Sequence, residues 1–266
     1  MNGSHPWSLN NQDRTQLVRY LEGRFPTIEE AGCKIGIGVA TGADRIFIDS
    51  YDKLDVEPSR KLPLATTKDC QNGQVKWQGR GVLNPFDEVS KLVSLERYPQ
   101  FEKYVMQHRS KLAARHVARK FPHRWYKTID RIDPTLAGKP KLLIPDIKGR
   151  ASIIYENQGL YPHHNLYYIT SQSWDLQALQ TVLLCGIAEL FVSAYSIRMR
   201  GGYLRYQAQY LRRIRLPKWE SVPEAAQRQL ITAAQEQRHL DCLSLVCDLY
   251  QLSKAQRRLV KQITAE

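Results

Sequence analysis

Apolar positions recur at helical spacing in two long stretches of this chain. After Pro99 the spacing predicts an amphipathic helix, whose apolar stripe is formed by Phe101, Tyr104, Val105, His108 and Leu112. Lys111, Arg115 and Arg119 are four positions apart, so they are expected on one neighbouring stripe of that helix. A second, more apolar run predicts a buried helix from about Asp175 to Arg198, because its most apolar part is short and contains Glu189.

Shorter apolar runs, rich in branched and aromatic residues, predict strands. Three of them follow one another at 141–147, 151–156 and 166–171. Two more, KIGIGVA and RIFID, are expected on either side of a turn at Thr41–Asp44. Asn72-Gly73 has the composition of a tight hairpin turn. These runs place strands among the helices.

Both ends of the chain have a helical pattern. A short helical lead-in is expected before Pro26. Beyond Pro217, Ser221–Glu224 and Ser253–Gln256 fit helix-capping boxes, which predict a closing pair of helices. The expected fold class is mixed α+β, a strand-containing domain with packed helices and a C-terminal helical pair. The expected division is a lead-in at 1–30, a central domain at 31–218 and a helical segment at 219–266.

The excess and the distribution of basic residues indicate a class of binding partner. Lys and Arg outnumber Asp and Glu by 39 to 26, which gives a net charge of +13. Two windows, 103–127 and 195–219, contain 15 of the basic residues and none of the acids. They could be two solvated faces, but solvated faces usually interleave both signs. The segregation therefore favours a polyanionic partner such as nucleic acid.

The segment from Arg198 to Arg215 has the side chains that recognise DNA. Arginine forks bind guanine edges and phosphates, glutamine pairs with adenine edges, and aromatic rings stack on bases or pack against sugars. Gly201-Gly202 would permit close backbone approach. The alternative is an amphipathic segment whose tyrosines, Tyr203, Tyr206 and Tyr210, belong to the core. Both descriptions are expected to hold in part, with the tyrosines mostly packed.

Catalytic patterns are weaker. Gly36, Gly38 and Gly42 follow a strand, but Thr41 breaks the dinucleotide fingerprint and the next residues have a strand pattern. Leu83–Phe86, LNPF, lacks the second proline of the Asn-Pro-Pro-Tyr motif of amino-directed DNA methyltransferases.

The spacing of the histidines and cysteines does not predict a metal site or a disulfide framework. His163-His164 has no carboxylate or cysteine at ligand spacing, so no metal site is expected there. The five cysteines form no zinc spacing and, without a signal peptide, suggest reduced thiols in a cytosol. One enzymatic alternative remains open, a Mg²⁺-dependent restriction-type nuclease that uses Asp133, Asp146 and Lys148. A further alternative is an interaction subunit whose basic face docks an acidic protein.

Several segments, taken in order, resemble the region downstream of the catalytic domain in Taq-type adenine-specific DNA methyltransferases, including fused restriction–modification enzymes. They are GIGVATGADRIFID, RKLPL with WQGRGVLNPF, YPQFEKYVMQHRSKLAAR, WYKTIDRIDP, KPKLLIPDIKG, YPHHNLYYITS, RGGYLRYQAQYLRRIRLP and LDCLSLVCDLYQLSKAQRRLV. The match covers nearly the whole chain from about Gly36.

The resemblance implies a target-recognition domain that grips double-stranded DNA and recognises its sequence, while the target adenine is flipped into a catalytic half. Because the methyl-donor and Asn-Pro-Pro-Tyr motifs are missing, the chain is expected to be the recognition half alone, as a fragment, a truncated gene or a separate subunit. No cofactor is expected in this chain, and S-adenosylmethionine is expected in the absent half. The implied partners are double-stranded DNA and a catalytic domain or subunit, without a membrane. The implied setting is bacterial defence in the cytoplasm, associated with the nucleoid.

No catalytic or metal-binding residue is expected, and the expected DNA contacts come from both basic windows and the segments between them. Candidate base contacts are Arg200, Arg205, Gln207, His164 and Asn165, and candidate phosphate contacts are Lys111, Arg115, Arg119, Lys120 and Lys127. Further expected contacts are Trp125, Lys148, Arg150, His163, Arg198, Tyr203, Tyr206 and Arg212.

Overall fold

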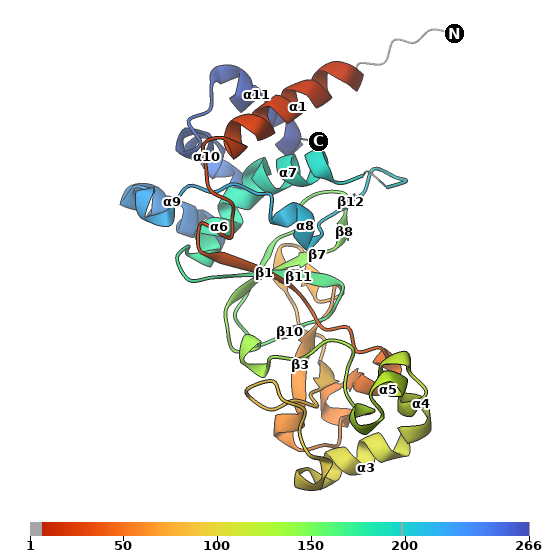
Figure 1. Cartoon of the computed structure of the whole chain (residues 1–266). Helices are drawn as coiled ribbons and strands as arrows, with labels where there is room; N and C mark the ends of the chain where they lie inside the picture. The colour runs from red at the N-terminus through yellow and green to blue at the C-terminus, as the bar shows by residue number, and fades with distance from the viewer. Residues whose placement is uncertain (1–6, 198, 266) are drawn as a thin grey trace, which may run out of the picture. The chain divides into compact units, whose positions relative to one another are not determined.

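The computed structural model describes residues 7–197 and 199–265 (Figure 1). The chain forms two compact units, each assembled from stretches that are distant in the sequence. Unit 1 takes in the described parts of Met1–Gly36, Lys141–Tyr155 and Tyr167–Glu266, and unit 2 takes in Ile37–Pro140 and Glu156–Leu166. These units group residues by contact and cut across the consecutive segments 1–30, 31–218 and 219–266, which stay a prediction of domain boundaries.

Unit 1 is mainly helical. Its helices are α1 (Trp7–Glu22), α6 (Leu176–Val182), α7 (Ala188–Tyr195), α8 (Ala208–Leu211), α9 (Glu224–Gln235), α10 (Leu243–Leu249) and α11 (Lys254–Ala265). α6 packs on α9, and α7 packs on both α1 and α11 (Figure 1). Together they enclose one large apolar core that includes Leu179, Phe191, Leu230 and Val260.

The long helix expected from about Asp175 is present with a break. α6 and α7 are joined by a π-helical turn, Leu183–Ile187, in which Gly186 has a φ of 91°. By length and composition, Leu176–Tyr195 could cross a membrane, but 78% of its apolar window is buried inside the protein. The run is therefore a core helix, as its pattern predicted.

The strands of unit 1 agree with the sequence pattern. A four-stranded sheet has the order β1 (Cys33–Ile37), β11 (Leu166–Ser171), β7 (Lys141–Pro145) and β9 (Ile154–Glu156). A two-stranded antiparallel ribbon pairs β8 (Ile147–Lys148) with β12 (Leu204–Arg205). The three predicted strand runs between 141 and 171 are thus confirmed, and the mixed α+β class with them.

The C-terminal prediction was wrong in one respect, because α9, α10 and α11 form three helices there rather than two. Ser253 and Gln256 form the expected capping box, in which each backbone N–H donates to the other side chain, at 2.8 and 3.4 Å. Ser221 does not cap α9, since its hydroxyl donates to the carbonyl of Lys218. Only one of the two boxes therefore marks a helix start, and α10 has no side-chain cap that would reveal it.

Unit 2 is built on a second four-stranded sheet. Its order is β10 (Tyr161–Pro162), β3 (Lys61–Ala65), β6 (Arg80–Leu83) and β2 (Ile48–Ser50). β6 is antiparallel to β2 and β3, and β10 runs parallel to β3. The predicted hairpin at Asn72-Gly73 joins β4 (Cys70–Gln71) to β5 (Gln74–Val75), and both turn residues have positive φ, 49° and 75°.

The helices of unit 2 differ from the pattern in two places. They are α2 (Asp44–Phe47), α3 (Pro99–Gln107), α4 (Arg109–Ala113) and α5 (His116–Lys120). The apolar stripe after Pro99 is confirmed at Phe101, Val105 and Leu112, which are fully buried. The single continuous helix is wrong, because the backbone leaves the helical region at His108 and Arg115.

The run predicted as a strand after the turn at Thr41–Asp44 also differs. Its first residues form the one-turn helix α2, in which Ile46 and Phe47 are buried, and only Ile48–Ser50 is a strand. The burial of two successive apolar side chains fits both conformations, so the local pattern does not separate them.

Gly38 allows two distant segments of unit 2 to pack closely. A Cβ atom at this position would lie 2.2 Å from the carbonyl oxygen of His163 and 2.3 Å from that of Pro162. The backbone N–H of Gly38 donates to Leu166, and that of Val39 donates to Pro162, both at 2.9 Å. The glycine therefore serves the close packing of the two backbone segments.

Gly38→Ala should lower the free energy of unfolding by roughly 1–3 kcal/mol, because the added methyl group would push the two backbones apart. Gly138→Ala is the matched control in the same unit, since its Cβ would have no other atom within 4 Å. Urea denaturation followed by circular dichroism measures both variants. Equal stability of the two would contradict the close packing at Gly38.

Candidate functional site

Polar side chains of unit 2 gather around the short helix α2. A hollow of about 550 Å³, called here the Arg80 hollow, is lined by Asp44, Arg45, Ile48, Thr66, Thr67, Lys68, Gln78, Arg80, His163 and Asn165. A second hollow of about 700 Å³, the His108 hollow, is lined by Ala40, Thr41, Gly42, Ala43, Asp44, Arg45, Ile46, His108, Lys111, Ile129 and His164. Asp44 and Arg45 line both hollows, so α2 forms their common wall.

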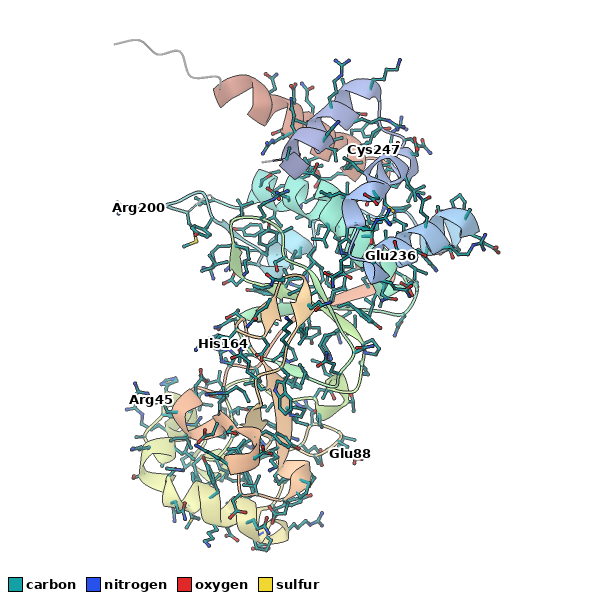
Figure 2. All side chains as sticks on the ribbon, turned by 180° about the vertical axis from the view of Figure 1, so that it is seen from behind. Arg45, Glu88, His164, Arg200, Glu236 and Cys247 are labelled. Carbon is teal, nitrogen blue, oxygen red and sulfur yellow. The ribbon has the colours of Figure 1, made fainter. Side chains whose placement is uncertain are left out.

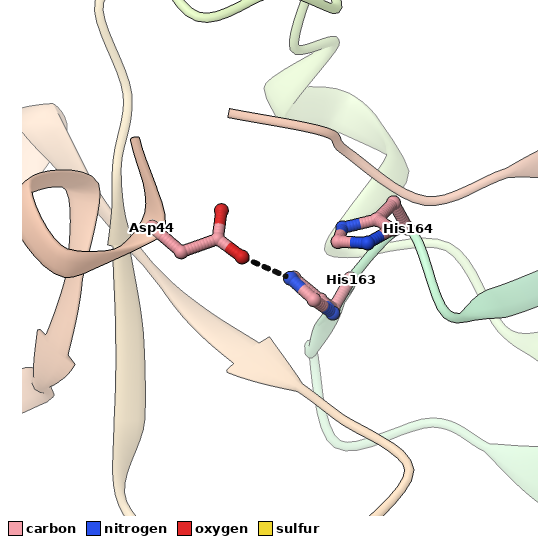
Figure 3. Close-up of side chains that lie close together, drawn as sticks. All are labelled: Asp44, His163 and His164. Atoms are coloured by element: carbon pink, nitrogen blue, oxygen red, sulfur yellow. Dashed lines mark hydrogen bonds and ion pairs between the residues drawn. The ribbon is translucent and has the colours of Figure 1, made fainter. Parts of the chain in front are cut away.

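Asp44 is held in place from its buried side. The Thr41 hydroxyl donates to one carboxylate oxygen and accepts a hydrogen bond of 3.1 Å from the backbone N–H of Ala43. The other oxygen lies 3.2 Å from Nε2 of His163 (Figure 3). Thr41 is fully buried, whereas the Asp44 side chain is 46% exposed. The carboxylate thus has a fixed orientation and an open face.

The charges of this pair follow from its surroundings. Burial by itself would raise the pKa of the Asp44 carboxyl, but hydrogen bonds from Thr41 and His163 outweigh burial and hold the pKa below its usual value. Burial is the largest cause that lowers the pKa of His163, and His164 adds to it while Asp44 opposes it. Near neutral pH the pair is therefore a carboxylate anion that accepts from a neutral imidazole.

The histidines are positioned by the end of β10. The backbone N–H of His163 donates to Ala65 of the adjacent β3 at 2.9 Å, and that of His164 donates to Val39 at 3.1 Å. Their rings lie 4.0 Å apart between centroids, and Figure 3 shows both rings on the side that faces Asp44. The strand register thus brings the side chains of two distant parts of the sequence, Asp44 and the two histidines, to one place.

A metal ion is one group that such an arrangement could accept. Within residues 7–197 and 199–265, Asp44, His163 and His164 are the group whose ligand atoms all lie within 4.8 Å of one another. Carboxylate and imidazole are both zinc ligands. No carboxylate lies at ligand spacing from the histidines in the sequence. Asp44 is 119 positions away from His163, and only the fold brings the two side chains together.

Arg115 has a different role from the phosphate contact predicted for it. Its guanidinium donates to the carbonyls of Thr41, Trp125 and Lys127 at 3.0, 2.7 and 2.7 Å, and its Nε donates to that of Leu112 at 3.1 Å. Burial lowers the pKa of this arginine, which stays protonated at any physiological pH. The side chain therefore joins separate loops of unit 2. Of the expected basic stripe of Lys111, Arg115 and Arg119, the middle residue is thus engaged within the protein.

The other predicted contacts of unit 2 remain at or near its surface. Arg119 and Lys120 are exposed on α5, and Trp125 is partly exposed. The ammonium of Lys127 lies 5.4 Å from the ring centroid of Phe121. Four predicted residues line the two hollows around α2, and these are Lys111, His163, His164 and Asn165.

In unit 1 several predicted contacts have partners within the protein. Arg205 forms an ion pair with Asp146. Arg212 donates to Glu29 at 3.1 Å and to the carbonyl of Ile35 at 3.2 Å. Tyr206 is fully buried, so its ring belongs to the core rather than to a DNA-facing surface. These three side chains thus make contacts within unit 1, and their predicted contacts with DNA stay a prediction.

Other predicted residues of unit 1 are more accessible. Arg200 is exposed on the loop before β12 (Figure 2), and Tyr203 of the same loop is exposed as well. Arg150 donates to the carbonyl of Thr264, Lys148 is partly exposed on β8, and Gln207 precedes α8. Arg198 lies outside the described residues.

The carboxylates of the nuclease alternative have structural partners. Asp133 accepts from the backbone N–H and the hydroxyl of Thr135 at 3.0 and 2.7 Å, as the cap of a short helical turn in unit 2. Asp146 lies in unit 1 and pairs with Arg205. These contacts give each carboxylate a local role without a metal ion.

Sequence reasoning missed the residues that give the Arg80 hollow its chemistry. These are Asp44, Arg45, Lys68, Gln78 and Arg80. None of them lies in either acid-free basic window, and they come from α2, β6 and the loops beside them. Figure 2 shows Arg45 projecting outward from unit 2. Only the pairing of β10 with β3 and of β6 with β2 brings them together.

The TaqI-like C-terminal specificity domain family matches residues 64–216, which is more than half of the chain. The chain belongs to this family. A curated relative, the type II methyltransferase M.PaeR7I of Pseudomonas aeruginosa, is 56% identical over 256 residues, which cover 96% of the chain and 45% of that protein. The chain therefore spans about half the length of this relative. The resemblance inferred from the ordered motifs is confirmed.

Two solved structures have the same fold at low sequence identity. The type IIG restriction endonuclease BpuSI matches with a TM-score of 0.58 and 14% identity, over 96% of this chain and 32% of that chain. The type IIL restriction–modification enzyme MmeI, solved in complex with DNA, matches with a TM-score of 0.53 and 11% identity, over 88% of this chain and 36% of that one. The fold of the specificity domain is thus shared with restriction–modification enzymes.

Arg115→Lys should lower the free energy of unfolding by roughly 2–4 kcal/mol, because an ammonium group cannot reach four carbonyls that a planar guanidinium reaches together. Arg119→Lys, on the exposed face of α5, is the control and should change stability by less than about 0.5 kcal/mol. Both changes keep the charge, and urea denaturation measures them. If the two variants were equally stable, Arg115 would be available for DNA after all.

Proposed function

We propose that the chain recognises the sequence of double-stranded DNA as the target-recognition part of an adenine-specific type II DNA methyltransferase. S-adenosylmethionine would be bound, and the methyl group transferred, by a catalytic part of the whole protein, in the bacterial cytoplasm at the nucleoid. Membership of the specificity-domain family and the name of the relative M.PaeR7I support this assignment. The net charge of +13 supports a polyanionic partner.

The observation that carries the proposal is the composition of the Arg80 hollow. Arginine pairs with guanine O6 and N7, asparagine and glutamine pair with adenine N6 and N7, and aspartate accepts from the cytosine amino group. Arg45, Arg80, Gln78, Asn165 and Asp44 supply all of these side chains to one hollow. A hollow lined by these five side chains would be able to distinguish base pairs by the donors and acceptors on their major-groove edges.

Basic residues next to the hollows would supply the affinity that does not depend on sequence. Lys68 lines the Arg80 hollow, Lys111 lines the His108 hollow, and Arg119 and Lys120 are exposed on α5. Such residues neutralise phosphates and release counterions, so that binding weakens as salt rises. Phosphate contacts of this kind position the protein while base contacts specify the site.

Arg80→Ala should weaken binding to a DNA site selected by the wild-type chain by about 1–3 kcal/mol more than binding to random duplex, because a base contact is lost. Fluorescence anisotropy with both duplexes, from 50 mM salt upward, measures this difference. Lys139→Ala is the control, since Lys139 is exposed in unit 2 and lines neither hollow.

Equal losses on both duplexes would make Arg80 a phosphate contact. A wild-type chain that binds no duplex even at 50 mM salt would contradict the proposed function, and the basic surfaces would then serve an acidic protein partner.

A further inference from the structure

Asp44 is an acid in basic surroundings. Among the described residues that line the two hollows it is the one acidic side chain, and it lies with Arg45, Lys68, Arg80 and Lys111. Exposed charges on a surface that binds DNA are expected to be positive, because every backbone phosphate is negative. An exposed carboxylate at this position would weaken the attraction of DNA unless it met a hydrogen-bond donor.

The carboxylate is also prepared to accept hydrogen bonds. Each of its oxygens already accepts one bond from within the protein, from the Thr41 hydroxyl and from Nε2 of His163. Each oxygen of an ionised carboxylate has a second acceptor direction. Both partners are buried while the Asp44 side chain is 46% exposed, so the carboxylate remains accessible to a donor from the surface. Little conformational freedom is left to lose when a ligand binds.

The donors that DNA offers are few and distinct. In the major groove the exocyclic amino groups, N4 of cytosine and N6 of adenine, carry the N–H donors, whereas guanine and thymine present acceptors and a methyl group. Arg45 and Arg80 could hold the nearby acceptor edges and phosphates in the Arg80 hollow. A carboxylate in the same hollow would accept from an amino group and repel the acceptor edge of the wrong base.

We infer that Asp44 forms a subsite for the exocyclic amino group of one base, cytosine or adenine, in the recognised DNA sequence. This inference rests on the proposed function, since it assigns one position of the sequence that the chain would recognise. Thr41 and His163 hold the carboxylate in place, and Arg45 and Arg80 line the same hollow.

Selection from a random duplex library tests the subsite with the full 266-residue chain. The wild-type chain should enrich a defined sequence in which one base pair depends on Asp44, and whether that pair is C·G or A·T tells which amino group is bound. Asp44→Asn and Asp44→Ala should lose discrimination at that position by about 5–100-fold, with the other positions unchanged. Their affinity for random duplex should stay equal or rise, because a negative charge is removed.

Asp52→Asn is the matched control. It removes the same charge from an exposed residue of unit 2 that lines neither hollow, and it should select the wild-type sequence. Circular dichroism confirms that each variant is folded, and the Asn and Ala variants check each other.

Four results would overturn the inference. If the Asp44 variants select the same sequence as the wild-type chain, the subsite is wrong while the proposed function stands. If the wild-type chain selects nothing, the proposed function fails and the subsite with it. If Asp52→Asn causes the same loss, the effect is one of general charge. If EDTA abolishes the wild-type preference and Zn²⁺ restores it, Asp44, His163 and His164 hold a metal ion instead.

Discussion

The candidate site depends on the close backbone contact between the segment that begins at Gly38 and the segment that ends β10. Residues far apart in the sequence hydrogen-bond there through their main chains, and a side chain at Gly38 would collide with the carbonyl of His163. This contact brings Asp44 to His163 and places α2 beside the sheet of unit 2. Arg115 also stabilises the segment that follows Gly38, because its guanidinium donates to the carbonyl of Thr41. Two ordinary features, a missing Cβ atom and a planar guanidinium, thus determine where the functional groups lie.

The sequence predicted well those features that depend on local periodicity. The buried stripe of Phe101, Val105 and Leu112, the hairpin at Asn72-Gly73 and the strands between 141 and 171 are all present. The mixed fold class and the family also followed from patterns and ordered motifs.

The site could be predicted only in part. Lys111, His163, His164 and Asn165 were expected to meet DNA, and they line the hollows around α2. The rest of the site is made by tertiary pairing, which leaves no local signal. Charge counting also failed to separate roles, because a basic residue such as Arg115 looks the same in a sequence whether it binds phosphate or carbonyl oxygens.

Charged residues are distributed in two ways in this protein, and each distribution suits a different part of DNA recognition. The acid-free basic windows, one in each unit, would provide general attraction for a polyanion through those basic residues that have no partner role such as that of Arg115 or Arg212. The hollows around α2 instead mix Arg, Asn, Gln and Asp, and such a mixture suits the alternating donors and acceptors of base edges. Sequence recognition would thus come from residues outside the windows that give the chain its charge.

The most direct test of this account is photo-cross-linking of the chain to a selected duplex substituted with bromodeoxyuridine, with mass spectrometry of the linked peptides. The account predicts cross-links in peptides that contain Arg45, Arg80 or Asn165. Cross-links confined to the segment 199–212 of unit 1 would contradict it, because sequence recognition would then lie in the basic window and not in the hollows around α2.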